Sequence, residues 1–390
     1  MIYLDNNATT ALDPRVAEVL MAAWQSGPAN ASSQHHFGRR ARGRLEAALD
    51  RIGQSLGSDL TRVDAARLIV TSGGTEANNL AVAGLGPEDG AILVSTIEHP
   101  SVLAAAASLE QHGRQVLSIG VDSDGVVSLA DLEQGLVESQ RRGTPVGLVS
   151  IMSANNETGV IQPIVEISEL CRAQGALLHV DATQSIGKTP VDLARWGAAA
   201  VTFTPHKYHG PAGVGFLWLA PGVTARASLH GGEQQLSTRP GTEPVPLVIA
   251  AAEATAIAVE EQPTAAIHMS RLRDRLEREL TNRYAQLIVH GQSAPRIAST
   301  TCLSLPGTDR QTVLMALDLA GVACSSGSAC SSGSSPPSHV LMAMGAGKSV
   351  VDAALRFGVS KFSTEEEVTR AIELISSKLR SAGGFAHVEN

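Results

Sequence analysis

Short, continuously apolar runs alternate with helix-like segments in the middle of the chain, and this alternation constrains the fold more than any other feature. Six runs predict strands, at residues 67–71, 91–96, 146–152, 176–180, 199–203 and 214–219. Apolar residues fill these runs without alternation, which is typical of strands buried on both faces of a parallel sheet. Because helical segments separate the strands, we expect an α/β fold with helices covering a mostly parallel sheet.

The character of the sequence changes near Ala250, where a long helical stretch with many charges begins. We interpret this stretch as a solvent-exposed connecting helix that leads into a smaller α+β domain. A chain of 390 residues is longer than one hydrophobic core usually serves, so we expect two domains. We place the large domain at residues 15–255 and the small domain at residues 1–14 and 256–390.

Composition argues against several classes of function. The net charge is −8, and no basic patch of the kind that binds nucleic acid is present. No apolar run reaches the ~18–20 residues of a membrane-spanning helix, and the N-terminus does not resemble a signal peptide. Neither a zinc site nor a disulfide framework is indicated by the four cysteines, Cys171, Cys302, Cys324 and Cys330. We expect a cytoplasmic protein with reduced thiols, without metal, membrane or nucleic-acid partners.

Polar residues follow several predicted strands, at the edge where α/β sheets bind ligands. Gly74 and Thr75 lie where a strand turns into a helix, which suits a phosphate, although an ordinary strand–helix turn is the commoner explanation for such residues taken alone. His99 could stack on an aromatic cofactor or transfer protons, or it could cap a helix. Asn155 could donate to a ring oxygen or shape a turn. Taken singly, each of these residues is explained as well by a structural role.

Two charged residues at strand ends narrow the chemistry. Asp181 follows the fourth predicted strand, where a buried carboxylate needs a metal, a basic side chain or a protonated pyridine nitrogen as its partner. Lys207 lies between two histidines after the fifth strand and is placed for Schiff-base chemistry, although a lone lysine is more commonly a surface residue. In combination, the strand ends supply the groups that a pyridoxal phosphate (PLP) enzyme requires.

Characteristic segments extend this interpretation from residue 3 to about residue 360. They read YLDNNATT, SSQHHFGR, VTSGGTEANN, EHPSV, NNETG, HVDATQSIGK, PHKYHGPAGVG, LHGGEQQ, RPGTE, SSGSACSSGSSPPSHVLMAMG and LRFGVS. In order and spacing the chain resembles the cysteine desulfurases, a branch of the fold-type I, class-V aminotransferase-like PLP enzymes. The long Ser/Gly-rich segment around Cys330 is similar to that of the iron–sulfur-assembly and nitrogen-fixation group. The resemblance implies a fold-type I transferase with a large mostly parallel-sheet domain and a smaller α+β domain.

The resemblance also implies roles for individual residues. Lys207 would bind PLP through its amine, Asp181 would pair with the pyridine nitrogen, and His99 would stack on the ring and transfer protons. The remaining cofactor contacts would be Gly74, Thr75, Asn155, Gln184, Thr204 and His206, together with Thr242, which would reach the phosphate of the partner subunit in a homodimer. The substrate contacts would be Arg356, which would clamp the carboxylate, together with Asn155 and Asn30.

Cys330 carries the distinguishing prediction. It lies in a Gly/Ser-rich segment, where a thiolate could reach the substrate and then present its product outside. The resemblance implies that Cys330 takes sulfur from L-cysteine as a persulfide while L-alanine leaves. We expect Cys171 and Cys302 to be buried and unreactive. Cys324, six residues before Cys330, is the competing candidate, and is either a bystander or a resolving thiol.

The expected function is therefore PLP-dependent cysteine desulfuration for iron–sulfur cluster or other sulfur-cofactor assembly, with a sulfur acceptor or scaffold protein as partner. A cysteine-derivative lyase or a transaminase of the same fold is the alternative, and it would not depend on Cys330. A non-catalytic sulfur-pathway protein would predict the loss of Lys207 or Cys330, and both are present. Three departures from the family pattern, Gln235 for an acid, Pro240 and Pro244, leave the partner protein open.

Overall fold

A seven-stranded sheet forms the centre of the computed structural model, which describes residues 1–62, 64–327 and 336–383. Within these residues the strand order is β2-β8-β7-β6-β5-β3-β4. The neighbouring strands are parallel except around β8, which is antiparallel to both β2 and β7. The strands are β2 (Arg67–Thr71), β3 (Ala91–Ser95), β4 (Val116–Ile119), β5 (Val146–Met152), β6 (Leu177–Asp181), β7 (Ala200–Phe203) and β8 (Gly215–Leu219).

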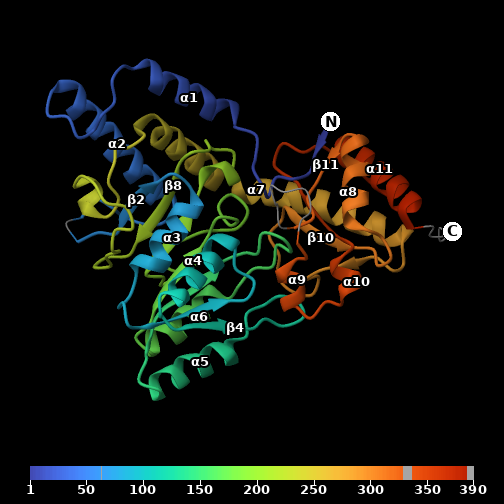
Figure 1. Ribbon diagram of the computed structural model, residues 1–390. Helices are drawn as coiled ribbons and strands as arrows, with labels where there is room; N and C mark the ends of the chain where they lie inside the picture. Colours follow the sequence, from blue (N-terminus) through green and yellow to red (C-terminus); the bar gives the residue numbers. More distant parts are fainter. Residues whose placement is uncertain (63, 328–335, 384–390) are drawn as a thin grey trace.

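Helices cover both faces of this sheet, as Figure 1 shows. Successive residues of a strand point to opposite faces, so Leu68 and Val70 pack in one apolar cluster and Ile69 in another. Both clusters are buried, which explains why the strands are apolar without alternation. The helices of this part are α1 (Pro14–Gln25), α2 (His36–Ser55), α3 (Gly74–Gly84), α4 (Pro100–Gln111), α5 (Leu129–Arg141) and α6 (Ile164–Ala173).

A second, smaller sheet is antiparallel and has the order β12-β10-β9 in the described residues. Its strands are β9 (Ile288–Val289), β10 (Thr300–Ser304) and β12 (Ala354–Gly358). Around it lie α8 (Arg310–Leu319), α9 (His339–Ala343), α10 (Lys348–Val351) and α11 (Glu365–Gly383). The chain start joins this part, because β1 (Ile2–Tyr3) pairs with β11 (Val322–Ala323) and Asp5 bridges to Gly358.

Helix α7 (Val245–Arg283) runs through both parts of the molecule (Figure 1). Its first half buries Ala250, Ala251 and Ala254 in the large cluster beside the seven-stranded sheet. Its second half places Leu272 and Leu276 in the cluster beside the small sheet. The prediction of a solvent-exposed connecting helix is therefore wrong. The alanine-rich face is a packing surface, since small side chains let α7 lie close to α1 and α2, and the charges occupy the other side.

The six predicted strands are all present, with ends that agree within one residue. Strand β4 was not predicted, because it lies at the sheet edge and is only partly buried. In the parts of the chain that the structure describes, none of the helices has the length and apolar character needed to cross a membrane.

Candidate active site

A cavity of about 320 Å³ opens where the parallel strands end at their carboxyl sides, and its size lies in the usual range of ligand pockets. The turns after β2, β3, β5, β6 and β7 all contribute to its walls, and the chain start and β12 close it from the small-sheet side. Its lining residues are Asn7, Ala8, Gly74, Thr75, Asn78, His99, Pro100, Ser101, Met152, Ala154, Asn156, Glu157, Asp181, Thr183, Gln184, Thr204, His206, Lys207, Gly327 and Arg356.

Asp181 is the last residue of β6 and is 4% exposed. Its Oδ2 accepts a hydrogen bond from the amide of Asn78 at 2.7 Å, and its Oδ1 accepts one from the backbone N–H of Thr183 at 2.9 Å. The Asn78 amide also donates to the Ser101 hydroxyl. In the described part of the chain this carboxylate forms no ion pair, so a buried negative charge at the cavity wall has donors but no cation.

Lys207 ends the short 3₁₀ helix η1 (Pro205–Lys207) that follows β7. Its Nζ donates to the backbone carbonyls of Asn7, at 2.8 Å, and Ala8, at 2.7 Å. Burial first, and then the charge of Arg356, lower the pKa of this amine to about 8. Lys207 is therefore held by neutral carbonyls in a site that favours the uncharged, nucleophilic amine.

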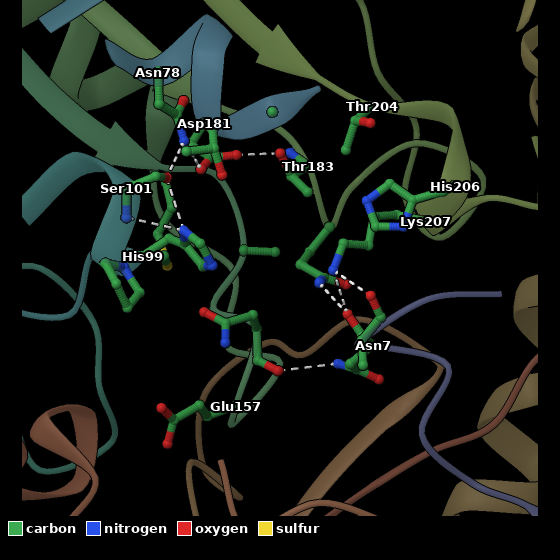
Figure 2. Close-up of a pocket in the computed structure, with 18 of the residues that line it drawn as sticks. Asn7, Asn78, His99, Ser101, Glu157, Asp181, Thr183, Thr204, His206 and Lys207 are labelled. Carbon is green, nitrogen blue, oxygen red and sulfur yellow. Dashed lines mark hydrogen bonds between the residues drawn. The ribbon is translucent and has the colours of Figure 1, made fainter. Parts of the chain in front are cut away.

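His99 faces Lys207 across the cavity, as Figure 2 shows. It caps α4, with Nδ1 accepting from the backbone N–H of Ser101 at 3.1 Å. Burial lowers the pKa of this imidazole below its ordinary value. The capping role that the sequence left open is thus real, and it fixes the ring with its other edge toward the cavity.

The N-terminus of α3 lies at the far end of the cavity. Gly73 is its N-cap and, having no side chain, leaves the first N–H groups of the helix without a side-chain acceptor. A Cβ at Gly215 would lie 2.4 Å from the backbone carbon of Gly73, so β8 can approach this turn only through a glycine. Free N–H groups beside the hydroxyl of Thr75 make a site for an anion.

Two more predicted residues line the cavity. Thr204 lines the cavity and donates its hydroxyl to the carbonyl of Val214 at 2.9 Å. His206 also lines it, and its Nδ1 lies 3.1 Å from the hydroxyl of Thr9. Burial lowers the pKa of His206 to about 4, with the charge of Lys207 acting in the same direction, so this ring is neutral at pH 7.

Arg356 reaches the cavity from β12 and is buried. It donates to the carboxylate of Asp5 at 2.8 Å and to the carbonyls of Asn156 and Gly327, at 3.1 and 3.3 Å. Its Nε has no partner among the described residues. A buried donor without a partner at the cavity wall leaves one position of the guanidinium for a bound acceptor.

Three predicted residues do not line this cavity. The Oδ1 of Asn155 accepts from the backbone N–H groups of Glu157 and Thr158, both at 2.9 Å, and its amide donates to the carbonyl of Ile97. Its side chain thus shapes the turn after β5. Asn30 is exposed and accepts from a backbone N–H two residues later. Thr242 is exposed as well, outside the cavity of its own chain.

Sequence reasoning missed two residues that hold the predicted ones in place. Asn78 binds the Asp181 carboxylate from α3, and the Asn7 carbonyl receives the Lys207 amine. The signal for Asn78 is its helical spacing from Gly74, which places both on one side of α3. Asn7 acts through its backbone, so its side-chain type carries no signal of that contact.

The surroundings of the described cysteines raise the pKa of each thiol. Cys171 is buried in α6, and burial raises the pKa of its thiol to about 12. Cys302 is buried in β10 and its thiol pKa is also raised by burial. Cys324 is partly exposed, yet burial of its thiol raises the pKa to about 12. Cys330 lies outside the described residues.

Comparison with known proteins gives the class of this site. Residues 2–371 match the aminotransferase class-V family. A cysteine desulfurase of Klebsiella pneumoniae is 39% identical over 94% of this chain and 90% of its own length, and one of Nostoc sp. is 36% identical over 100% and 96%. A solved NifS-like protein from Rickettsia africae superposes with a TM-score of 0.88 at 31% identity, covering 97% of this chain and 99% of that one.

The chain therefore belongs to the aminotransferase class-V family, whose cofactor is pyridoxal phosphate. Within that family its activity is that of a cysteine desulfurase, and its substrate is L-cysteine. The IscS- and NifS-like relatives match it over nearly its full length, which agrees with the group expected from the Ser/Gly-rich segment around Cys330.

The cavity residues fit this cofactor chemically. The carboxylate of Asp181 lacks a cation that a protonated pyridine nitrogen would provide. The amine of Lys207 has a lowered pKa, as a covalent attachment site requires. The N–H groups at the start of α3 suit a phosphate. The carboxylate, the amine and the helix N–H groups thus match the pyridine nitrogen, the aldehyde and the phosphate of one pyridoxal phosphate molecule.

Proposed function

We propose that Lys207, Asp181 and His99 form the catalytic centre of this cysteine desulfurase. The observation that carries the proposal is their arrangement around one cavity, with the Lys207 amine opposite His99 and the Asp181 carboxylate between donors at the strand ends. Gly74, Thr75, Thr204 and His206 would hold the cofactor phosphate, Gln184 would contact the ring, and Arg356 would bind the carboxylate of L-cysteine.

Bound pyridoxal phosphate supplies an electron sink that stabilises negative charge next to the amino group of the substrate. Asp181 would keep the ring nitrogen protonated, because a buried carboxylate gains more from a cation than from its N–H donors alone. Lys207 releases a proton near neutral pH and would therefore act both as the covalent anchor and as a base. His99, neutral because burial lowers its pKa, would accept or donate a proton on the opposite side.

We further propose that Cys330 receives the sulfur. The Cys330 thiolate would form a sulfur–sulfur bond with the sulfur of L-cysteine while the carbon–sulfur bond breaks, which makes a persulfide. The electron pair of the broken bond would stay on carbon and take up a proton, so that the three-carbon remainder leaves as L-alanine. A thiol has to be a thiolate to react. The other three cysteines are less suited to this role, because burial raises the thiol pKa of Cys171, Cys302 and Cys324 and so disfavours their thiolates.

The test compares Cys330→Ala with Cys324→Ala. Cys330→Ala should keep the visible absorbance of the bound cofactor and its change on adding L-cysteine, but lose the release of sulfide and L-alanine. Cys324→Ala is the matched control and should retain turnover, whereas Lys207→Ala should lose both absorbance and turnover. Sulfide release by Cys330→Ala at the parental rate would end the persulfide role, and release of pyruvate and ammonia would favour the lyase alternative.

The homodimer with a shared phosphate site is also a proposal. Thr242 follows Arg239, which pairs with Glu76 of α3 at 2.7 Å, so the exposed segment is anchored beside the cofactor site of its own chain. Thr242 would extend from there to the phosphate of the partner subunit. Mixed dimers of Lys207→Ala and Thr242→Ala chains test this, because each dimer holds one site free of both substitutions and should recover activity. Independent sites would give no recovery.

The remaining proposals concern location, partners and domain limits. We propose a cytoplasmic enzyme that passes its persulfide sulfur to an acceptor or iron–sulfur scaffold protein, measured as transfer of labelled sulfur from the loaded enzyme. For the domains we keep residues 15–255 as the large unit, with residues 1–14 and 256–390 as the small one. The separate apolar clusters beside the two sheets support this division.

A further inference from the structure

Lys188 is a buried lysine that the roles assigned above leave without a function. It lies at the end of the HVDATQSIGK segment and is 8% exposed. Its Nζ donates to the Oε1 of Gln184 at 2.5 Å, and within the described residues it forms no ion pair. A buried ammonium without a carboxylate is costly, so its retention calls for an explanation.

Gln184 passes this contact on to the cavity. Its Nε2 donates to the backbone carbonyl of Asn7 at 3.0 Å. The same carbonyl receives the Nζ of Lys207 at 2.8 Å. Three hydrogen bonds therefore connect the two lysines through one amide and one carbonyl, and Gln184, Asn7 and Lys207 all line the cavity.

The chemistry of these groups fixes the direction of every bond. A lysine amine at this site donates to the oxygen of an amide, and a backbone carbonyl can only accept. Lys188 therefore turns the Oε1 of Gln184 toward itself, which leaves the NH₂ group to face Asn7 and the cavity. Without Lys188 the amide could rotate by half a turn, and its oxygen would then oppose the Asn7 carbonyl that anchors Lys207.

We propose that Lys188 is a positioning residue, which orients the Gln184 amide and through it the Asn7 carbonyl that holds the reactive Lys207. The inference rests on the proposed roles of Lys207 and Gln184 in binding pyridoxal phosphate. It gives the segment 181–188 two functions, since Asp181 at one end contacts the cavity directly and Lys188 at the other acts from behind its wall.

The electrostatic surroundings favour this explanation over a purely structural one. Burial first, and then the positive charges of Lys207 and Arg356, lower the pKa of Lys188 to about 7. The imidazoles of His206 and His209 also face it and have lowered pKa values. The charges that act on Lys188 are the cations Lys207 and Arg356, whereas Glu261, which lines a cavity together with Lys188, is already paired with Arg15 and Lys361. An apolar side chain of similar length would therefore stabilise the fold at least as well.

The experiment combines Lys188→Met, Lys188→Arg and Gln184→Ala, singly and in pairs. The dissociation constant of pyridoxal phosphate is measured by visible absorbance on protein from which the cofactor has been removed, together with the absorption maximum of the reconstituted enzyme. Lys188→Met should bind about tenfold more weakly and shift the maximum, because the amide loses its orientation. Lys188→Arg, which keeps a donor, should restore most of both.

The paired variants separate positioning from general damage. In the Gln184→Ala background the Lys188→Met change should alter the dissociation constant less than about twofold, because the residue through which it acts is gone. Lys361→Met is the control, since Lys361 is a mostly buried lysine paired with Asp13 and Glu261 at 2.8 and 2.7 Å. That control should lower the thermal unfolding temperature and leave the absorption maximum in place.

Binding by Lys188→Met at the parental affinity, or an equal loss in both backgrounds, would overturn the inference and leave the proposed function intact. A parental chain that binds no pyridoxal phosphate would overturn both. Thermal unfolding of each variant shows whether it folds. If the Lys188→Met chain does not, Lys188→Leu, which is apolar and has no donor for the Gln184 amide, takes its place in the same comparison with the same expected outcomes.

Discussion

The side chain of Glu98 should make the stability of the fold decrease as the pH rises through neutrality. Glu98 has no exposed surface, and its Oε1 accepts from the Ser95 hydroxyl at 2.5 Å and the Met152 N–H at 2.8 Å. Its Oε2 has no partner in the described residues. Burial raises the pKa of Glu98 to about 8, and the negative charge of Asp181 adds to the effect.

The magnitude follows from the difference between the folded and unfolded states. An unfolded glutamate has a pKa of about 4.3, so between about pH 4.5 and pH 8 the folded chain retains a proton that the unfolded chain has released. The stability from this group is complete below the unfolded pKa and is lost as the pH rises to the folded pKa. The loss is about 1.4 kcal/mol per pH unit and about 5 kcal/mol over the whole window.

Glu98→Gln is the matched variant, because glutamine has the shape of the protonated acid and cannot ionise. Urea unfolding of both chains at about pH 5.5 and about pH 7.5 should show the variant gaining roughly 3 kcal/mol relative to its parent across that interval. Subtracting the two curves cancels the titration of distant groups. A difference that does not change with pH would refute the raised pKa and the burial argument behind it.

Four further substitutions have defined outcomes. Gly215→Ala should weaken pyridoxal phosphate binding at least about tenfold in an absorbance titration, because its Cβ displaces the turn before α3, whereas Gly43→Ala on an open helix face should stabilise by about 0.5–1 kcal/mol in thermal unfolding. Gln235→Glu should lower the free energy of urea unfolding by about 1–3 kcal/mol, since the amide that donates to the Val70 carbonyl at 3.0 Å is lost. Arg356→Lys should raise the KM for L-cysteine about tenfold or more in steady-state kinetics, because an ammonium lacks the guanidinium fork. An unchanged value in any of these measurements would contradict its contact.

Gln235 also explains one departure from the family pattern. Its Oε1 accepts from the Val70 N–H at 2.6 Å and its Nε2 donates to the Val70 carbonyl at 3.0 Å. The side chain thereby pairs with the outer edge of β2, as a neighbouring strand would. An acid in its place could accept but not donate, so the amide suits this chain. Nothing in the structure explains Pro244.

The sheet could be predicted from the sequence because strands that are buried on both faces need apolar residues at nearly every position. The strands predicted at residues 67–71 and 146–152 coincide with β2 and β5. Helix α7 shows the limit of the same reasoning. Its charges suggested exposure, but Ala250 and Ala254 are buried in the large apolar cluster, and small residues carry too little hydrophobicity to reveal a buried face.

For the site, strand ends were a better guide than side-chain chemistry. Asp181, His99 and Lys207 come together because parallel strands bring their carboxyl ends to one edge. The local turn decided the orientation of Asn155. Its side-chain oxygen accepts from the backbone N–H of Glu157, and its amide donates to the carbonyl of Ile97 in the adjoining loop. Contacts made by a backbone carbonyl, such as that of Asn7, depend on the whole fold and leave no trace in the sequence.

The contacts of the chain start have a consequence for the order in which the enzyme becomes active. Asp5 pairs with Arg356, the Asn6 amide donates to the carbonyl of Gly358, and the Asn7 amide donates to the Thr300 hydroxyl. Asp5, Asn6 and Asn7 therefore wait for partners that are translated much later than they are. Even with the large sheet already folded, the carbonyl that receives Lys207 is not fixed until β12 has emerged, so we expect that the growing chain cannot act on cysteine before β12 has been translated.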